Sequence, residues 1–243
     1  MSRCRDCYRH LKPAWIWVLV LPLLVLAGCN SKPPASAGAT VKTGAAETVY
    51  EGTIVAVGDS LTAGLRVDED QAYPAQLARR LKADGYAFRV VNAGVSGETS
   101  SGTLARIQWV ISALKPDIVI LETGANDGLR GIDPNLVAEN LDQLLTRLKA
   151  AGVQVVLAGM RMLPNLGAEY TRAFARVYPE QAQKHQVLLM PFFLEGVAGD
   201  ASLNQADGLH PTAQGYKRVV DHLYPYVLKA IARYRAAHAG KGG

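Results

Sequence analysis

Short β-rich runs alternate with helical patterns along most of this 243-residue chain, and this alternation predicts an α/β fold. Several of the runs are continuously apolar, which is typical of strands that are buried on both faces of a parallel sheet. The length suffices for one domain with a complete core. We therefore predict a three-layer α/β/α domain, in which a parallel, doubly wound sheet of about five strands lies between two layers of helices.

The expected strands and helices alternate without exception. Strands are predicted at residues 53–57, 88–92, 117–122, 153–158 and 187–190, and helices at about 72–84, 101–114, 134–150, 168–184 and 212–236. The helix at 134–150 has clear periodicity, because its apolar residues recur with helical spacing: Leu136, Val137, Leu141, Leu144, Leu145 and Leu148. Pro134 suits its first turn, and Gly152 suits its end.

The first 28 residues have the pattern of an export signal, in which a basic start precedes an apolar stretch from Ala14 to Gly28. That stretch contains Pro22 and is short for a membrane-spanning helix. It ends in Leu26-Ala-Gly-Cys29, which resembles the lipobox of bacterial lipoproteins. The resemblance implies cleavage before Cys29 and lipidation of its thiol. A retained hydrophobic anchor is the alternative.

Residues 29–47 are expected to form a lipidated cysteine and a flexible tether, because the segment is rich in Ser, Pro, Ala and Gly and lacks apolar periodicity. A folded domain is then expected over residues 48–239. The lipobox resemblance implies a protein of the periplasm that is anchored to a bacterial membrane. Asn30 follows the cysteine where an inner-membrane protein would have Asp, which favours the outer membrane.

Charge argues against a nucleic-acid partner. The net charge of +5 arises largely in the first 28 residues, and the rest of the chain holds 22 basic and 20 acidic residues. No basic run with interleaved aromatic residues occurs in that part, as nucleic-acid binding would require. We expect the domain to be a monomer that binds a small acyl-ester or lipid substrate, for the reasons that follow.

Ser60, Asp207 and His210 are the candidate catalytic residues. Ser60 lies in Gly58-Asp-Ser-Leu61, directly after the first predicted strand, and Asp207-Gly-Leu-His210-Pro211 precedes the last predicted helix. Such loops meet at the carboxyl edge of a parallel sheet. A serine, a histidine and an aspartate together make an activated oxygen nucleophile, in which the carboxylate orients the imidazole toward the hydroxyl. The alternative for Ser60 alone is a helix cap.

Asn92-Ala-Gly94 and Gly124-Ala-Asn126-Asp127 follow the second and third predicted strands. The backbone N–H groups of Ser60 and Gly94 and the Asn126 side-chain amide could bind the oxyanion of an acyl transfer. The missing Cβ of Gly94 would let a substrate approach its N–H closely. Glycine and asparagine also occupy such turns for backbone reasons alone. The remaining histidines of the domain, His185, His222 and His238, are expected at the surface.

These four segments, in this order, resemble the four blocks of the SGNH (GDSL) hydrolase superfamily. Its name-giving residues map to Ser60, Gly94, Asn126 and His210. Within the superfamily, residues 58–64, 96–100 and 126–131 are similar to the thioesterase I/arylesterase/lysophospholipase group. The resemblance implies a flavodoxin-like fold, a triad of Ser60, His210 and Asp207, and neither a metal nor a cofactor.

The resemblance also implies that two loops, at residues 128–132 and 160–164, line an acyl pocket. The candidate lining residues are Leu129, Arg130, Ile132, Met162, Leu163 and Pro164. The chain departs from the group at Ala125, where a second glycine is common, and at Val95. The implied function is a serine esterase that hydrolyses acyl esters, and thioesters as a further substrate class, through an acyl-enzyme.

Three other functions remain open at this point. A cell-wall glycan O-acetyl esterase or transacylase would use the same triad. A flavodoxin-type phosphate- or nucleotide-binding module would cradle an anion in the loop at residues 58–64. That loop has no lysine and carries Asp59, and such a module leaves Asp207 and His210 without a role. The third is a non-catalytic lipoprotein that binds lipids or a protein partner.

Overall fold

The computed structural model of the chain describes residues 49–162 and 164–239. The predicted signal peptide, the predicted lipidation site Cys29 and the tether lie outside these residues, as does Leu163. None of the helices in the described ranges is both long enough and apolar enough to cross a membrane.

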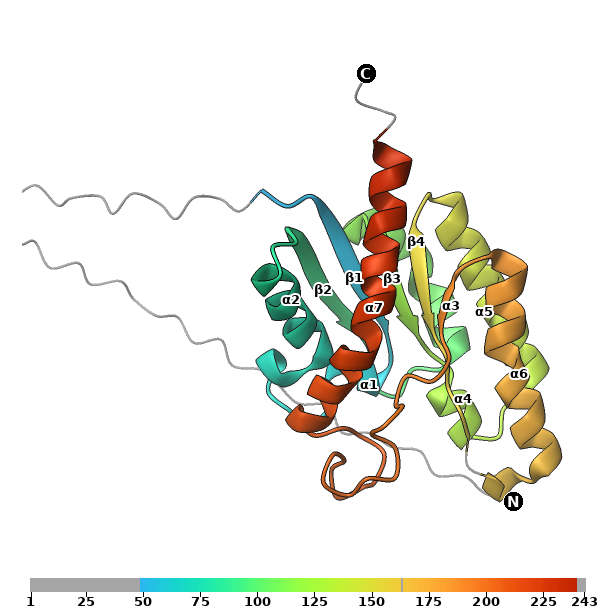
Figure 1. Cartoon of the computed structure of the whole chain (residues 1–243). Helices are drawn as coiled ribbons and strands as arrows, with labels where there is room; N and C mark the ends of the chain where they lie inside the picture. The colour runs from blue at the N-terminus through green and yellow to red at the C-terminus, as the bar shows by residue number, and fades with distance from the viewer. Residues whose placement is uncertain (1–48, 163, 240–243) are drawn as a thin grey trace, which may run out of the picture. The chain divides into compact units, whose positions relative to one another are not determined.

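Five parallel strands form one sheet in the order β2-β1-β3-β4-β5, which is the flavodoxin-like order (Figure 1). They are β1 (Gly52–Gly58), β2 (Phe88–Gly94), β3 (Ile118–Glu122), β4 (Gln154–Ala158) and β5 (Leu188–Met190). The predicted fold class is therefore confirmed. The chain passes from β1 outward to β2 and then returns to the other side of β1, and open α/β sheets bind ligands at such a switch point.

Helices cover both faces of the sheet. On one face, α2 (Tyr73–Ala83) packs against α7 (Ala213–His238), and on the other face α5 (Pro134–Ala150) lies between α3 (Ser100–Trp109) and α6 (Ala168–His185) (Figure 1). The short helices α1 (Ser60–Ala63) and α4 (Ala125–Leu129) follow β1 and β3. Single turns occupy Glu69–Gln71, Val110–Leu114 and Pro164–Leu166.

The predicted apolar runs form the middle of the core. The side chains of residues 54–57 and 118–121 are all fully buried, as expected for the two central strands. In α5, five of the six predicted core residues are fully buried, and Leu136 is the exception at 43% exposure. Leu136 lies about 100° around the helix from Val137, at the margin of the buried face.

β2 continues to Gly94, two residues beyond the predicted end of this strand. Asn92, Ala93 and Gly94 pair in register with Ala56, Val57 and Gly58 of β1. The segment that was expected to be a loop at the site is therefore part of the sheet. This changes the surroundings of Gly94, which are described with the site below.

His185 is buried, which corrects its predicted place at the surface. The residue is 8% exposed, and its Nε2 lies 2.6 Å from Asp142 Oδ1. The pair links the end of α6 to α5. His185 lies at the end of α6, where this helix packs against α5 and excludes solvent. The sequence around His185 does not reveal this contact between the two helices. His222 is half-buried, and His238 is exposed as expected.

Candidate active site

Ser60, His210 and Asp207 form one hydrogen-bonded row at the carboxyl edge of the sheet. Ser60 Oγ lies 2.9 Å from His210 Nε2, and His210 Nδ1 lies 2.8 Å from Asp207 Oδ2. When Nδ1 carries a proton toward the carboxylate, Nε2 is left to accept the proton of the serine. The structure thus brings together the three residues that the sequence singled out, at distances that permit proton transfer.

Ser60 is the first residue of α1, and Asp59 is the cap of that helix. Asp59 Oδ1 accepts the Leu61 N–H at 2.9 Å. Because Asp59 caps the helix, the Ser60 hydroxyl does not serve as the cap and stays directed at His210. Ser60 is 8% exposed, and it lines the cavity described below.

The loop before α7 presents His210. Asp207 Oδ1 accepts the backbone N–H groups of Leu209 and His210, each at 3.0 Å. Arg66 donates to Asp207 Oδ2 at 2.9 Å. The His210 N–H, then the Leu209 N–H and the imidazole, hold the pKa of Asp207 well below its usual value. Asp207 is therefore a carboxylate throughout the pH range in which an esterase works.

Asn126 lies beside Ser60, on the first turn of α4. Its Nδ2 donates to Asp59 Oδ2 at 3.1 Å and to the Glu98 carbonyl at 3.0 Å. Ser60 and Asn126 line the same cavity. The nitrogen end of the amide thus faces the first turn of α1, which is the orientation that an oxyanion donor needs.

Gly94 is not placed to bind an oxyanion, which corrects the sequence-based expectation. Its N–H donates to Asn92 Oδ1 at 3.0 Å, and Gly94 is absent from the cavity lining. A Cβ at this position would collide with the backbone nitrogen of Ala63. Glycine is thus required here because α1 crosses the end of β2 closely, rather than because a substrate does.

Gly97 lines the cavity beside Ser60 and Asn126, and the sequence reasoning did not assign it a role. Its φ is +81°, a conformation that favours glycine, and its N–H makes no hydrogen bond within the described part of the chain. Gly97 belongs to Ser96-Gly-Glu-Thr-Ser100, one of the stretches that carried the resemblance to the thioesterase group. The similarity of that stretch to the thioesterase group was the signal in the sequence that could have indicated a role for Gly97.

A cavity of about 640 Å³ opens at the triad. Its apolar side chains include Leu61, Leu65, Leu129, Met160, Met162, Phe192, Leu194 and Leu209. A volume of this size is in the range of roughly 300–1,000 Å³ that is usual for small-molecule sites, which are mostly apolar with a few polar groups. The arrangement places an apolar wall next to a serine that can attack a carbonyl group.

Of the predicted lining residues, Leu129 and Met162 line this cavity. Arg130 and Ile132 do not, which corrects their assignment. The Arg130 guanidinium donates to the Gly97 carbonyl at 2.9 Å, and Ile132 packs on the core while its carbonyl accepts the Tyr170 hydroxyl at 2.8 Å. Leu163 lies outside the described residues, and so does the side chain of Pro164.

Phe192 and Leu194 form a wall that the sequence analysis did not assign. They follow β5 in the run Pro191-Phe-Phe-Leu194, an apolar segment at a carboxyl strand end, which could have indicated it. Arg161 also lines the cavity, and its guanidinium lies 5.1 Å from the centroid of the Phe192 ring.

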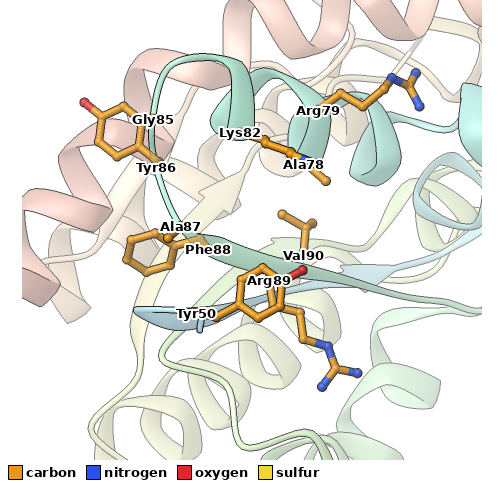
Figure 2. A pocket seen from close by; sticks show the side chains of 10 residues that line it. All are labelled: Tyr50, Ala78, Arg79, Lys82, Gly85, Tyr86, Ala87, Phe88, Arg89 and Val90. Atoms are coloured by element: carbon orange, nitrogen blue, oxygen red, sulfur yellow. The ribbon is translucent and has the colours of Figure 1, made fainter. Parts of the chain in front are cut away.

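A second cavity, of about 400 Å³, lies at the opposite end of the sheet, between α2 and the start of β2 (Figure 2). Tyr50, Tyr86 and Phe88 contribute aromatic rings to it, and Arg79, Lys82 and Arg89 contribute cations. It holds neither a serine nor a histidine. The triad therefore lies at the first cavity and not at this one.

Comparisons with known proteins identify the family of the chain. The chain matches the profile of the GDSL-like Lipase/Acylhydrolase family over residues 56–218. It is 43% identical to the esterase TesA of Pseudomonas aeruginosa over 173 residues, which cover 71% of this chain and 86% of that protein. It is 37% identical to the thioesterase 1/protease 1/lysophospholipase L1 of Escherichia coli K12 over 169 residues, which cover 70% of this chain and 80% of that protein.

The chain is also similar to a solved structure over most of its length. The psychrotrophic esterase EstA of Pseudoalteromonas sp., inhibited by monoethylphosphonate, superimposes with a TM-score of 0.72 at 30% sequence identity. The alignment covers 75% of this chain and 100% of EstA.

Proposed function

The chain belongs to the GDSL-like Lipase/Acylhydrolase family and is a carboxylic ester hydrolase, and we propose that Ser60, His210 and Asp207 perform its reaction. The observation that carries the proposal is the 2.9 Å contact between Ser60 Oγ and His210 Nε2, with the other ring nitrogen on Asp207. The known relatives named as esterase and thioesterase support the same chemistry.

The first half-reaction acylates Ser60. His210 Nε2 takes the hydroxyl proton while Ser60 Oγ attacks the carbonyl carbon of the substrate. The tetrahedral intermediate then collapses, the bond to the leaving alcohol or thiol breaks, and His210 returns the proton to the leaving group. Water enters, gives its proton to His210, and releases the acid from Ser60. Asp207 stays ionised and stabilises the imidazolium in both halves.

The oxyanion is bound by the backbone N–H groups of Ser60 and Gly97 and by Asn126 Nδ2. Ser60 begins a helix, so its N–H has no acceptor in the preceding turn. Removal of one such donor in other acyl-transfer enzymes costs about 3–4 kcal/mol of transition-state stabilisation. Both amide hydrogens of Asn126 are engaged, with Asp59 at 3.1 Å and with the Glu98 carbonyl at 3.0 Å. The oxyanion takes the hydrogen that the Glu98 carbonyl accepts, while Asp59 continues to hold the amide.

The apolar wall of the cavity favours medium-length acyl chains over acetyl groups. Each buried methylene contributes about 0.8 kcal/mol, so a longer chain gains affinity until the cavity is filled. An O-acetyl esterase for glycans would bind a short acyl group and a polar sugar, which do not match an apolar wall made of Met162, Phe192 and Leu194. We therefore place acyl esters and acyl thioesters ahead of acetylated glycans as substrates.

Cys29 is the proposed site of lipidation, and the proposed location is the periplasmic face of the outer membrane. The lipobox Leu26-Ala-Gly-Cys29 and Asn30 support this location. The tether at residues 30–47 would leave the domain free to reach substrates in solution or at the membrane surface.

Ser60→Ala tests the mechanism directly. The full chain and its variant are assayed on p-nitrophenyl esters of two to twelve carbons, on an acyl-CoA and on a lysophospholipid. Loss of the nucleophile should lower kcat by about a thousandfold or more. Ser112→Ala is the matched control, because Ser112 lies on the surface, where its hydroxyl donates to helix carbonyls. Undiminished turnover by folded Ser60→Ala protein would rule the mechanism out.

A further inference from the structure

A second carboxyl group lies beneath the nucleophile, and the reaction as described does not use it. Glu122 is the last residue of β3, and its side chain is completely buried. It meets Asp59, the residue before Ser60, which is 1% exposed. Two carboxyl groups, one at the end of β3 and one just after β1, thus come together without a cation between them, an arrangement that requires a specific reason.

The contacts of Glu122 are unequal at its two oxygens. Oε2 accepts the Thr62 hydroxyl at 2.8 Å and the Asp59 N–H at 3.3 Å. Oε1 is buried and receives no hydrogen from any described residue. The Glu122 and Asp59 carboxyl groups are also hydrogen-bonded to each other. Two carboxyl groups form such a bond only when one of them carries a proton.

Asp59 has the contacts of a carboxylate. Its Oδ1 accepts the Leu61 N–H at 2.9 Å, and its Oδ2 accepts Asn126 Nδ2 at 3.1 Å. Burial raises the pKa of Asp59 to about 6, against the Leu61 N–H and the Glu122 and Asn126 side chains, which lower it. Burial, and then the charge of Asp59, raise the pKa of Glu122 well above its usual value. Both oxygens of Asp59 accept N–H groups, whereas Oε1 of Glu122 accepts none, so the contacts assign the proton to Glu122.

No nearby cation alters this assignment. The titratable and charged groups around the pair come from the helices and the loop packed on it: Tyr73, Arg106, Asp127, Tyr178, His210 and Tyr216. Burial raises the pKa of each of these three tyrosines, so they stay neutral. The Arg106 guanidinium is paired with Glu98 at 2.7 Å.

We propose that Glu122 is a positioning residue of the oxyanion site: as a neutral acid it donates to the Asp59 carboxylate, which in turn keeps the nitrogen of the Asn126 amide facing Ser60. The proposal rests on the role of Asn126 proposed above. A carboxylate at Asp59 accepts only, so it selects the NH₂ end of the Asn126 amide. Without that acceptor, the Glu98 carbonyl alone selects the NH₂ end among the described contacts, and the amide can rotate once its hydrogen turns from that carbonyl to the oxyanion.

Two isosteric variants distinguish which acid carries the proton. Glu122→Gln supplies an N–H where the proposal puts an O–H, so it should lower kcat far less than Asp59→Asn does. Asp59→Asn replaces the acceptor with an amide that can face Asn126 with its own NH₂. It should lower kcat by about 10- to 100-fold with little change in KM, because an oxyanion contact is made only in the transition state.

Stability against pH gives a readout that does not depend on catalysis. Unfolded Glu122 loses its proton near its ordinary pKa of about 4.3, whereas the folded protein keeps it. Stability of the wild type should therefore fall as pH rises above that value, and glutamine removes this effect. The Tm of Glu122→Gln minus the Tm of the wild type should increase between about pH 5 and pH 8.

Glu139→Gln, at an exposed position of α5, is the matched control and should show a Tm difference that does not vary with pH. A constant Tm difference for Glu122→Gln, or a loss of kcat equal to that of Asp59→Asn, would overturn the proposal. So would a tolerated Asp59→Asn beside an inactive Glu122→Gln, since Glu122 would then carry the charge. Failure of the triad mechanism is seen separately, in Ser60→Ala, and leaves the Tm profile unaffected.

Discussion

Ser60 Oγ and His210 Nε2 lie 2.9 Å apart although 150 positions separate the two residues in the sequence. The contact arises because β1 ends at Gly58 and the loop before α7 passes the same edge of the sheet (Figure 1). Asp207 fixes that loop from within, through the N–H groups of Leu209 and His210. The sheet thus places the nucleophile, and one short loop places both its base and the carboxylate that orients the base.

Asp207→Asn should reduce both activity and stability, and the stability effect depends on pH. The folded protein holds the pKa of Asp207 below its unfolded value of about 3.9, so ionised Asp207 stabilises the fold above that pH. This contribution is lost as pH falls through the folded pKa. The Tm difference between wild type and variant should therefore be full near neutral pH and should shrink in strong acid.

The measurement is thermal unfolding by circular dichroism across that pH range, with kcat determined near neutral pH. A reduction of kcat by about 10³- to 10⁴-fold is expected, because asparagine does not stabilise the imidazolium and favours the wrong tautomer. Asp70→Asn, at an exposed position of the turn before α2, is the control. A Tm difference for Asp207→Asn that persists unchanged in acid would contradict the argument.

Gly97→Ala separates backbone strain from catalysis when it is compared with Gly85→Ala. Both glycines have a φ of +81°, and a Cβ at either meets no atom within 4 Å. Each substitution should therefore cost about 1–2 kcal/mol of stability for the left-handed conformation. Only Gly97→Ala should also lower kcat, by about tenfold or more, because it shifts an oxyanion donor.

Gly94→Ala completes the comparison. It should destabilise the protein more than either of the other two substitutions, since its Cβ meets the backbone of Ala63. Tm and kcat are measured for all three variants. Equal kcat for Gly97→Ala and Gly85→Ala would remove Gly97 from the oxyanion site.

The fold and the triad could be predicted because their signals are local. Continuous apolar runs mark buried strands, and Asp207 and His210 are three residues apart on one loop. Gly94 was wrongly assigned to the oxyanion site because the pairing of β2 with β1 determines where β2 ends. Its partner, Gly58, is 36 positions away, and no pattern within residues 88–94 reveals that the strand continues.

The cavity wall and His185 show the same limit. Phe192 and Leu194 follow β5 and become a wall only because the chain turns back over the site before α7. His185 is buried because Asp142, on another helix, lies 2.6 Å from its ring. Helical periodicity predicts only the apolar face of one helix at a time. It therefore does not predict contacts between segments that are far apart in the sequence.

Cys29→Ser tests the anchor. If Cys29 is the lipidated residue, the variant should lose incorporation of a fatty-acid label and should shift from the membrane fraction to the soluble fraction. Cys7→Ser is the control, since Cys7 precedes the apolar stretch and would leave with the signal peptide. Membrane retention of an unlabelled Cys29→Ser protein would favour a retained hydrophobic segment in place of a lipid.

Met162→Trp should shorten the acyl-chain preference. Met162 lines the cavity and packs against Gly128, where a Cβ would collide with the Met162 side chain, so the two residues fix one wall closely. A larger ring at this position takes up volume that long chains would fill. Each methylene that is no longer buried costs about 0.8 kcal/mol, or about fourfold in kcat/KM.

The p-nitrophenyl ester series checks this prediction within one experiment. The acetyl ester is the internal control, because a two-carbon acyl group has no methylene groups to bury against the wall. Its kcat/KM should stay the same while the values for eight to twelve carbons fall. An equal fall for every ester would mean that the substitution disturbs the triad, and an unchanged profile would mean that acyl chains bind along another wall.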